Sequence, residues 1–88
     1  MEPLSDEQLV KYYLSGDEAA FEALLLRYLT PIYNFVARQI GDRTAAQDVT
    51  QEAFMKAWKN LSQFDATKRF KVWLFRIARN SAIDYLRT

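Results

Sequence analysis

The chain has 88 residues, a formal net charge of +1 and 50% hydrophobic residues, and it contains neither cysteine nor histidine. This length fits one domain over residues 1–88, and the composition excludes a disulfide framework, a thiolate zinc site and a histidine base. We therefore expect no enzyme, metal or cofactor. No apolar run approaches the ~18 residues of a membrane span, and the acidic N-terminus differs from a secretory signal, so we expect a cytoplasmic protein without membrane insertion.

Hydrophobic periodicity predicts helices throughout the chain and indicates no strand. The first helix is predicted to begin after Ser5, which forms a capping-box pattern with Gln8, and to end at Gly16. The second is predicted to begin after Asp17 and to end at Gly41.

Two further helices complete the predicted fold. Pro31 lies inside the second helix and predicts either a kink or a split after Thr30, because proline lacks an amide hydrogen and crowds the preceding turn. A Thr44 cap, with Gln47 completing a capping box, begins the third helix. The third helix runs to about Leu61, a loop follows over 62–68, and the fourth runs from Arg69 or Phe70 to about Arg87. The fold class is all-α, a compact bundle of about four helices.

The apolar stripe of each helix predicts the core. The expected core residues are Leu9, Val10, Tyr13 and Leu14; Ala20, Phe21, Leu24, Leu25, Tyr28, Leu29, Ile32, Val36, Ala37 and Ile40; Ala46, Val49, Ala53, Ala57 and Leu61; and Phe70, Leu74, Phe75, Ile77, Ala78, Ser81, Ala82, Tyr85 and Leu86.

The third helix carries apolar residues outside its core stripe. Met55 and Trp58 follow Gln51 at spacings of four and three residues, and they lie beside Asp48 and Glu52. Apolar side chains ringed by polar ones are typical of a surface that binds a partner. The alternative is that Trp58 packs beneath a neighbouring helix.

Charge is unevenly distributed along the chain. Residues 1–41 carry a net charge of −3 and residues 42–67 a net charge of −1, whereas residues 68–88 carry +5. An acidic front and a basic end indicate two partner surfaces, one of them for a polyanion. An ordinary solvated face is the alternative interpretation.

The fourth helix combines side chains that suit nucleic acid. Arg76, Asn80 and Arg87 share one face, with Arg79 on one flank and Trp73 on the other. Arginine neutralises phosphates, asparagine pairs with a base edge, and an aromatic ring stacks on a base.

The loop before the fourth helix contains an aromatic residue among basic ones. Phe64 precedes Lys68, Arg69 and Lys71, an arrangement that could form a stacking platform for a single-stranded base. Alternatively, Phe64 folds back and plugs the end of the bundle.

Three segments, residues 16–24, 48–58 and 70–80, resemble the second conserved region of bacterial sigma factors of the extracytoplasmic-function group. Their sequences are GDEAAFEAL, DVTQEAFMKAW and FKVWLFRIARN, and the resemblance covers essentially the whole chain in the same order and spacing. It implies a non-enzymatic sigma factor domain. Such a domain binds the β′ clamp helices of core RNA polymerase, recognises the minus-ten promoter element and promotes strand opening.

The resemblance also implies a role for each matching residue. The polymerase-binding residues would be Asp48, Gln51 and Glu52, which meet basic residues of the clamp helices, with Met55 and Trp58 as apolar contacts. Asn80 would read a base at the upstream edge of the minus-ten element, and the loop around Phe64 would capture a flipped base of the non-template strand. The DNA-binding set is Phe64, Lys68, Arg69, Lys71, Trp73, Arg76, Arg79, Asn80 and Arg87.

The chain departs from the family pattern in three places. Trp73-Leu74 replaces the two adjacent tryptophans of housekeeping sigma factors, and the loop over 64–69 lacks the glycine often found there. The family normally continues into a helix-turn-helix domain, whereas this sequence ends at Thr88, so we expect an isolated or truncated domain.

Two other functions remain open from the sequence. One is a helix-turn-helix module for duplex DNA, although the seven-residue loop and the aromatic content of the basic face argue against it. The other is a protein-interaction bundle that binds no nucleic acid. The resemblance also leaves open whether an anti-sigma factor covers the clamp-binding face.

Overall fold

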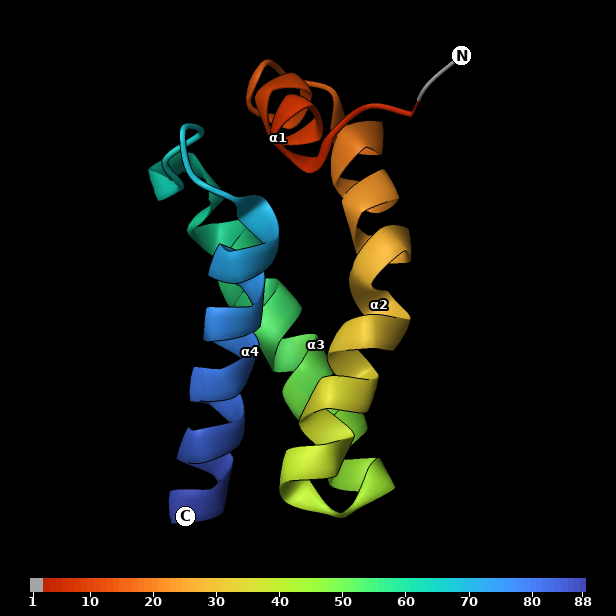
Figure 1. The fold of residues 1–88 in the computed structure, drawn as a ribbon, viewed down its shortest axis with the longest axis vertical. Helices are drawn as coiled ribbons and strands as arrows, with labels where there is room; N and C mark the ends of the chain where they lie inside the picture. The colour runs from red at the N-terminus through yellow and green to blue at the C-terminus, as the bar shows by residue number, and fades with distance from the viewer. Residues whose placement is uncertain (1–2) are drawn as a thin grey trace.

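The computed structural model describes residues 3–88, and over these residues it contains helices and connecting turns but no strand (Figure 1). The elements are α1 (Asp6–Leu14), α2 (Glu18–Ile40), α3 (Arg43–Lys59), the short 3-10 helix η1 (Leu61–Gln63) and α4 (Phe70–Arg87). The predicted all-α bundle of four helices is confirmed.

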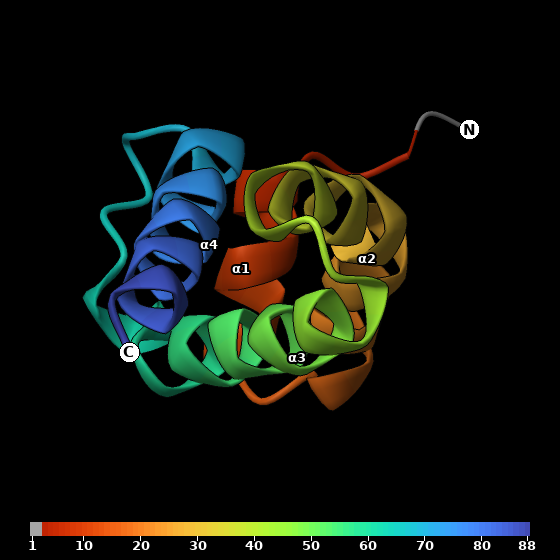
Figure 2. The same cartoon turned by 90° about the horizontal axis from the view of Figure 1, so that it is seen from below.

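The three longer helices form the body of the bundle, and α1 closes one end of it. α3 packs against both α2 and α4, and the two views show α1 lying across the end where α2 and α4 begin (Figures 1 and 2). η1 and the loop that follows it lie at this same end. The turn between α2 and α3 lies at the opposite end, the end at which α4 also finishes.

Helix starts follow local capping rules, with one correction to the prediction. Ser5 and Gln8 form the predicted capping box, at distances of 2.8 and 3.1 Å between backbone nitrogen and side-chain oxygen. The predicted Thr44 cap is wrong, because Asp42 caps α3 by accepting from the amides of Thr44 and Ala45 at 2.9 and 3.2 Å. A carboxylate two residues earlier satisfies two amides at once and suits the helix dipole.

α2 runs unbroken through its proline. The helix spans Glu18–Ile40 with Pro31 exposed inside it, so the predicted split after Thr30 is wrong. Because Pro31 lies on the solvent side of the helix, the backbone hydrogen bond that it cannot make is lost outside the core. α2 ends as predicted at Gly41, which adopts a left-handed conformation with φ 80°.

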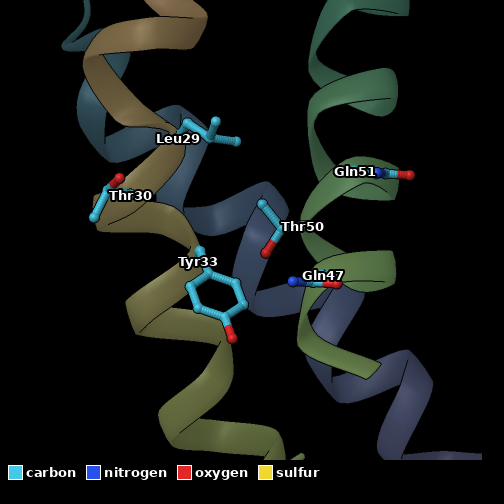
Figure 3. Close-up of a pocket in the computed structure, with 6 residues that line it drawn as sticks. All are labelled: Leu29, Thr30, Tyr33, Gln47, Thr50 and Gln51. Carbon is cyan, nitrogen blue, oxygen red and sulfur yellow. The ribbon is translucent and has the colours of Figure 1, made fainter. Parts of the chain in front are cut away.

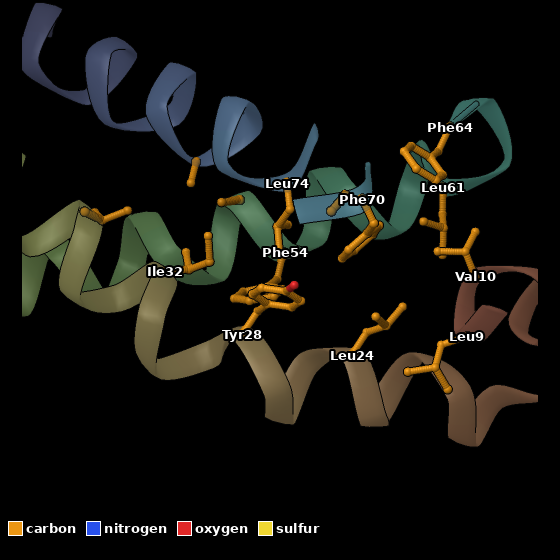
Figure 4. Close-up of a cluster of buried hydrophobic side chains, with 14 of the residues drawn as sticks. Leu9, Val10, Leu24, Tyr28, Ile32, Phe54, Leu61, Phe64, Phe70 and Leu74 are labelled. Atoms are coloured by element: carbon orange, nitrogen blue, oxygen red, sulfur yellow. The ribbon is translucent and has the colours of Figure 1, made fainter. Parts of the chain in front are cut away.

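The core fills the space between the four helices (Figure 4). The predicted stripe of α3 is confirmed as buried, and Thr50 and Phe54 are buried beside it. The buried hydrophobic residues are Leu9, Val10, Ala20, Leu24, Tyr28, Ile32, Val36, Ala46, Val49, Ala53, Phe54, Ala57, Leu61, Phe64, Phe70, Leu74, Ala78 and Ala82.

Four residues predicted for the core are exposed instead. Leu14, Leu29, Tyr85 and Leu86 each keep more than two fifths of their surface accessible. Leu14, Tyr85 and Leu86 lie in the last turns of α1 and α4, where the bundle ends. Leu29 lies at the edge of the α2 stripe and lines a surface groove described below. Within residues 3–88, no helix is both long and apolar enough to cross a membrane.

Candidate docking and nucleic-acid interfaces

One face of α3 is exposed to solvent. Asp48, Gln51, Glu52, Met55 and Trp58 are all exposed, with 58% of Met55 and 52% of Trp58 accessible. The opposite face of the same helix forms the core, because the helical repeat separates the two sets of residues. The five predicted polymerase-binding residues therefore lie together on one exposed surface, called here the α3 face.

Trp58 is both exposed on the α3 face and packed against neighbouring helices, so it combines the two alternatives that its sequence position allowed. Its indole nitrogen donates a hydrogen bond to the hydroxyl of Tyr13, and its ring lies 6.4 Å from that of Phe21 between centroids. Half of the side chain is nevertheless exposed. Contacts from α1 and α2 thus hold the ring in place at the end of the α3 face.

A groove of about 500 Å³ adjoins the α3 face (Figure 3). The hydroxyl oxygen of Thr50 is buried there without a hydrogen-bond partner, and Thr50 faces Tyr33 across the gap between α2 and α3. No sequence motif predicted this groove, and the signal available for it was Leu29, an apolar residue at the edge of the α2 stripe. The lining residues are Leu29, Thr30, Tyr33, Gln47, Thr50 and Gln51.

A second pocket, of about 510 Å³, lies between the loop and the first turns of α4, and it is called here the loop pocket. Five of the nine predicted DNA-binding residues line it, and three of these five are cations. The lining residues are Gln63, Phe64, Asp65, Lys68, Arg69, Val72, Trp73 and Arg76. The basic residues and the aromatic residues predicted from the sequence are therefore brought together here.

Phe64 folds inward. Only 6% of it is exposed, and its ring lies 5.7 Å from that of Phe70 and 5.2 Å from that of Trp73 between centroids. The interpretation of Phe64 as a projecting stacking platform is therefore wrong for this structure, because burying the ring closes the end of the core. Phe64 plugs the bundle and forms part of the pocket wall.

Asp65 shapes the loop that lacks a glycine. Its carboxylate accepts hydrogen bonds from the Thr67 hydroxyl at 2.7 Å and the Thr67 amide at 2.9 Å, while its carbonyl accepts from the Lys68 amide at 2.9 Å. The hydroxyl and amide of Thr67 lower the pKa of Asp65. An Asp turn of this kind forms without the conformational freedom of glycine, and within residues 3–88 no non-glycine residue has a positive φ.

The remaining predicted DNA contacts lie outside the loop pocket. Arg79, Asn80 and Arg87 are exposed farther along α4. Lys71 is also exposed, but it lies about 140° around the helix from Arg76, so the two cannot line one pocket.

The pocket also contains residues that the sequence analysis did not select. Gln63, Asp65 and Val72 line it, and 54% of Val72 is exposed. An apolar residue outside the core stripe of α4 was the available signal for Val72, as it was for Met55 on α3. Within residues 3–88, no three acidic side chains gather as metal ligands.

These surfaces define an all-helical domain with one acidic and apolar face and one basic face. The family model of Sigma-70 region 2 matches residues 24–88, so the chain belongs to the Sigma-70 region 2 family. Its curated relatives place it in the extracytoplasmic-function (ECF) group.

Three sigma factors illustrate the similarity. The RNA polymerase sigma-H factor of Pseudomonas aeruginosa is 43% identical over 81 residues, which are 92% of this chain and 42% of the relative. SigW of Bacillus subtilis is 38% identical over 89% of this chain and 42% of its own length, and the Escherichia coli sigma-E factor is 41% identical over 97% and 44%. The chain thus spans less than half the length of these curated relatives.

Two solved structures share the fold. An engineered region 2 of sigmaE, solved by NMR in complex with GTAAAA, superposes with a TM-score of 0.90 at 41% identity, covering 98% of this chain and 90% of that chain. CnrH in complex with the cytosolic domain of CnrY gives a TM-score of 0.80 at 36% identity, covering 90% and 51%. The family resemblance predicted from three sequence segments is therefore confirmed.

Proposed function

We propose that this chain is the polymerase-binding and promoter-opening domain of an ECF sigma factor. The single observation that carries the proposal is the loop pocket, in which aromatic side chains lie among Lys68, Arg69 and Arg76 on the fold that binds GTAAAA in sigmaE. We infer that residues 1–88 act as one domain, in the cytoplasm, without chemistry of their own.

We propose that the α3 face binds the β′ clamp helices of core RNA polymerase. Asp48 and Glu52 supply negative charge, and exposed Met55 and Trp58 supply apolar area. Charges complementary to a basic partner guide the encounter, and a central apolar residue contributes most to affinity. Trp58 suits this role because Tyr13 and Phe21 already restrict its ring, so less side-chain freedom is lost on binding.

The loop pocket and the exposed face of α4 are proposed to bind the non-template strand of the minus-ten element. The cations at the pocket would neutralise phosphates on either side of a flipped base. The exposed part of Trp73 and the methyl groups of Val72 offer apolar surface to that base. Asn80, one turn beyond Arg76, would read a neighbouring base edge.

An inhibitory protein is the second proposed partner. CnrH, which shares this fold, was solved with the cytosolic domain of CnrY. We propose that an anti-sigma factor also binds this chain and covers its α3 face, because that face presents large apolar side chains to solvent.

The DNA proposal is tested by fluorescence anisotropy with the single strand GTAAAA, the scrambled strand AATAGA and the GTAAAA duplex. We expect the wild-type domain to prefer the matched single strand over both others. Asn80→Ala should reduce discrimination between the two strands by about 1–3 kcal/mol, because one base contact is lost. Asn34→Ala, at an exposed position on α2, is the matched control. Equal binding of all three oligonucleotides by the wild-type domain would contradict the proposal.

A further inference from the structure

The first turn of α4 is capped by a different helix. Arg69, at the N-cap position, makes no side-chain hydrogen bond to the helix. Instead, the carboxylate of Glu7 on α1 accepts a hydrogen bond from the Phe70 amide at 2.8 Å, across 63 residues of sequence. The first amides of a helix have no partner within it, and a carboxylate there also interacts favourably with the helix dipole.

Glu7 reaches α4 from a helix that is itself fixed. The neighbouring Asp6 forms an ion pair with Arg27 at 2.7 Å and accepts a hydrogen bond from the hydroxyl of Tyr28. Burial and the hydrogen bond to Asp6 raise the pKa of Tyr28, so the hydroxyl remains a donor. The two acidic residues of the first turn therefore tie α1 to α2 and to α4.

The amide that Glu7 binds belongs to Phe70, which directly follows two residues that line the loop pocket. Phe70 is 2% exposed and lies near Phe64 in the core (Figure 4). Its ring contacts those of Phe64 and Trp73, which both line the pocket. Lys68 and Arg69 directly precede Phe70. The point at which the loop becomes a helix therefore sets where these two cations stand.

We propose that Glu7 is a positioning residue for the nucleic-acid pocket, which it does not itself line. This role rests on the proposed function. The direction in which DNA affinity changes when Glu7 is removed distinguishes positioning from a simple charge effect. Removing an acidic residue from a protein that binds a polyanion raises affinity when charge alone acts. Removing a residue that holds the pocket cations in place lowers it.

The test compares Glu7→Ala with Glu22→Ala, which makes the same charge change at an exposed position on α2. Anisotropy with single-stranded GTAAAA should show unchanged or tighter binding for Glu22→Ala and about two- to fivefold weaker binding for Glu7→Ala. Glu7→Gln, which keeps an oxygen acceptor, should recover part of the loss. In ¹H–¹⁵N spectra, the Phe70 amide resonance should move in Glu7→Ala and stay in place in Glu22→Ala.

If Glu7→Ala fails to fold by circular dichroism, Glu7→Asp replaces it, because it keeps the charge but withdraws the acceptor from the Phe70 amide by one methylene. Glu22→Asp is then the control, and weaker binding of GTAAAA by Glu7→Asp alone is expected. Binding by Glu7→Ala equal to that of Glu22→Ala, with an unmoved Phe70 amide, would overturn the positioning role while the proposed function stands. A wild-type domain without preference for GTAAAA would overturn the proposed function, and with it the role of Glu7 in DNA binding. The Phe70 amide would then still report whether Glu7 caps α4.

Discussion

The α3 face and the loop pocket differ in how they are joined to the core. The α3 face consists of exposed side chains whose helix buries the opposite side. The loop pocket is walled by Phe64 and Trp73, whose rings contact each other and the buried Phe70. One surface can therefore change without affecting the fold, whereas the other shares residues with it.

This difference follows from local geometry. A helix of 17 residues can give one side to the core and the other to a partner, because side chains repeat every 3.6 residues. At the end of a bundle, core residues and surface residues are not separated in this way. The residues that close it, Phe64 above all, also form the surface presented there.

The largest expected effect is on stability, in the loop pocket. Phe64→Ala should destabilise the domain by about 3–5 kcal/mol, because it removes a buried aromatic ring from the end of the core. Thermal unfolding by circular dichroism measures this loss, with Phe64→Leu as the milder control. An unchanged melting temperature together with weaker DNA binding would restore the interpretation of Phe64 as a stacking platform.

Charge reversal on the α3 face should change binding and leave the fold intact. Replacing Asp48 and Glu52 with Lys should weaken binding to a β′ clamp-helix fragment by about 2 kcal/mol or more, because like charges then face a basic partner. The exposed Glu52–Lys56 ion pair, at 3.2 Å, contributes only about 0.3–0.5 kcal/mol to stability. Replacing Glu18 and Glu22 with Lys gives the same charge change elsewhere, and equal loss in both double variants would remove the α3 face from the interface.

Pro31 lies in α2, which carries neither of the two proposed binding surfaces. Pro31→Ala should keep the fold and raise its stability by up to about 2 kcal/mol, since it restores a helix former and an amide hydrogen in an unbroken helix. Binding to both partners should stay the same. A large fall in melting temperature would show that packing depends on the local geometry around the proline.

The smallest expected effects concern single phosphate contacts. Arg76→Ala and Arg79→Ala should each weaken binding to every single strand alike and reduce the slope of log affinity against log salt by about 0.7. Arg38→Ala, at an exposed position on α2, is the matched control and should leave the slope unchanged. A slope that does not change in either α4 variant would place the DNA away from this face.

Sequence reasoning succeeded where one helix determines the outcome. The helical repeat predicted which side of α3 is buried, and the Ser5–Gln8 pattern predicted a cap that depends on neighbouring residues only. The prediction of a Thr44 cap failed because Asp42, two positions earlier, also suits an N-cap and takes that position.

Contacts between residues far apart in the sequence could not be predicted from local patterns. The hydrogen bond from the Phe70 amide to Glu7 joins residues 63 positions apart, and no local pattern indicates it. The burial of Phe64 likewise depends on where α4 meets the loop, because its ring packs against those of Phe70 and Trp73. Residue type and charge predicted that the loop would suit nucleic acid, whereas the tertiary fold determined which side chains reach its surface.

The most direct test of the account measures both partners with both kinds of variant. The Asp48→Lys, Glu52→Lys double variant and the Asn80→Ala variant are each titrated against the β′ clamp-helix fragment and against single-stranded GTAAAA. We expect the first to lose the clamp fragment and keep its preference for the matched strand, and the second to do the reverse, with unchanged melting temperatures. Loss of both partners in either variant, with the fold intact, would contradict two separate binding surfaces.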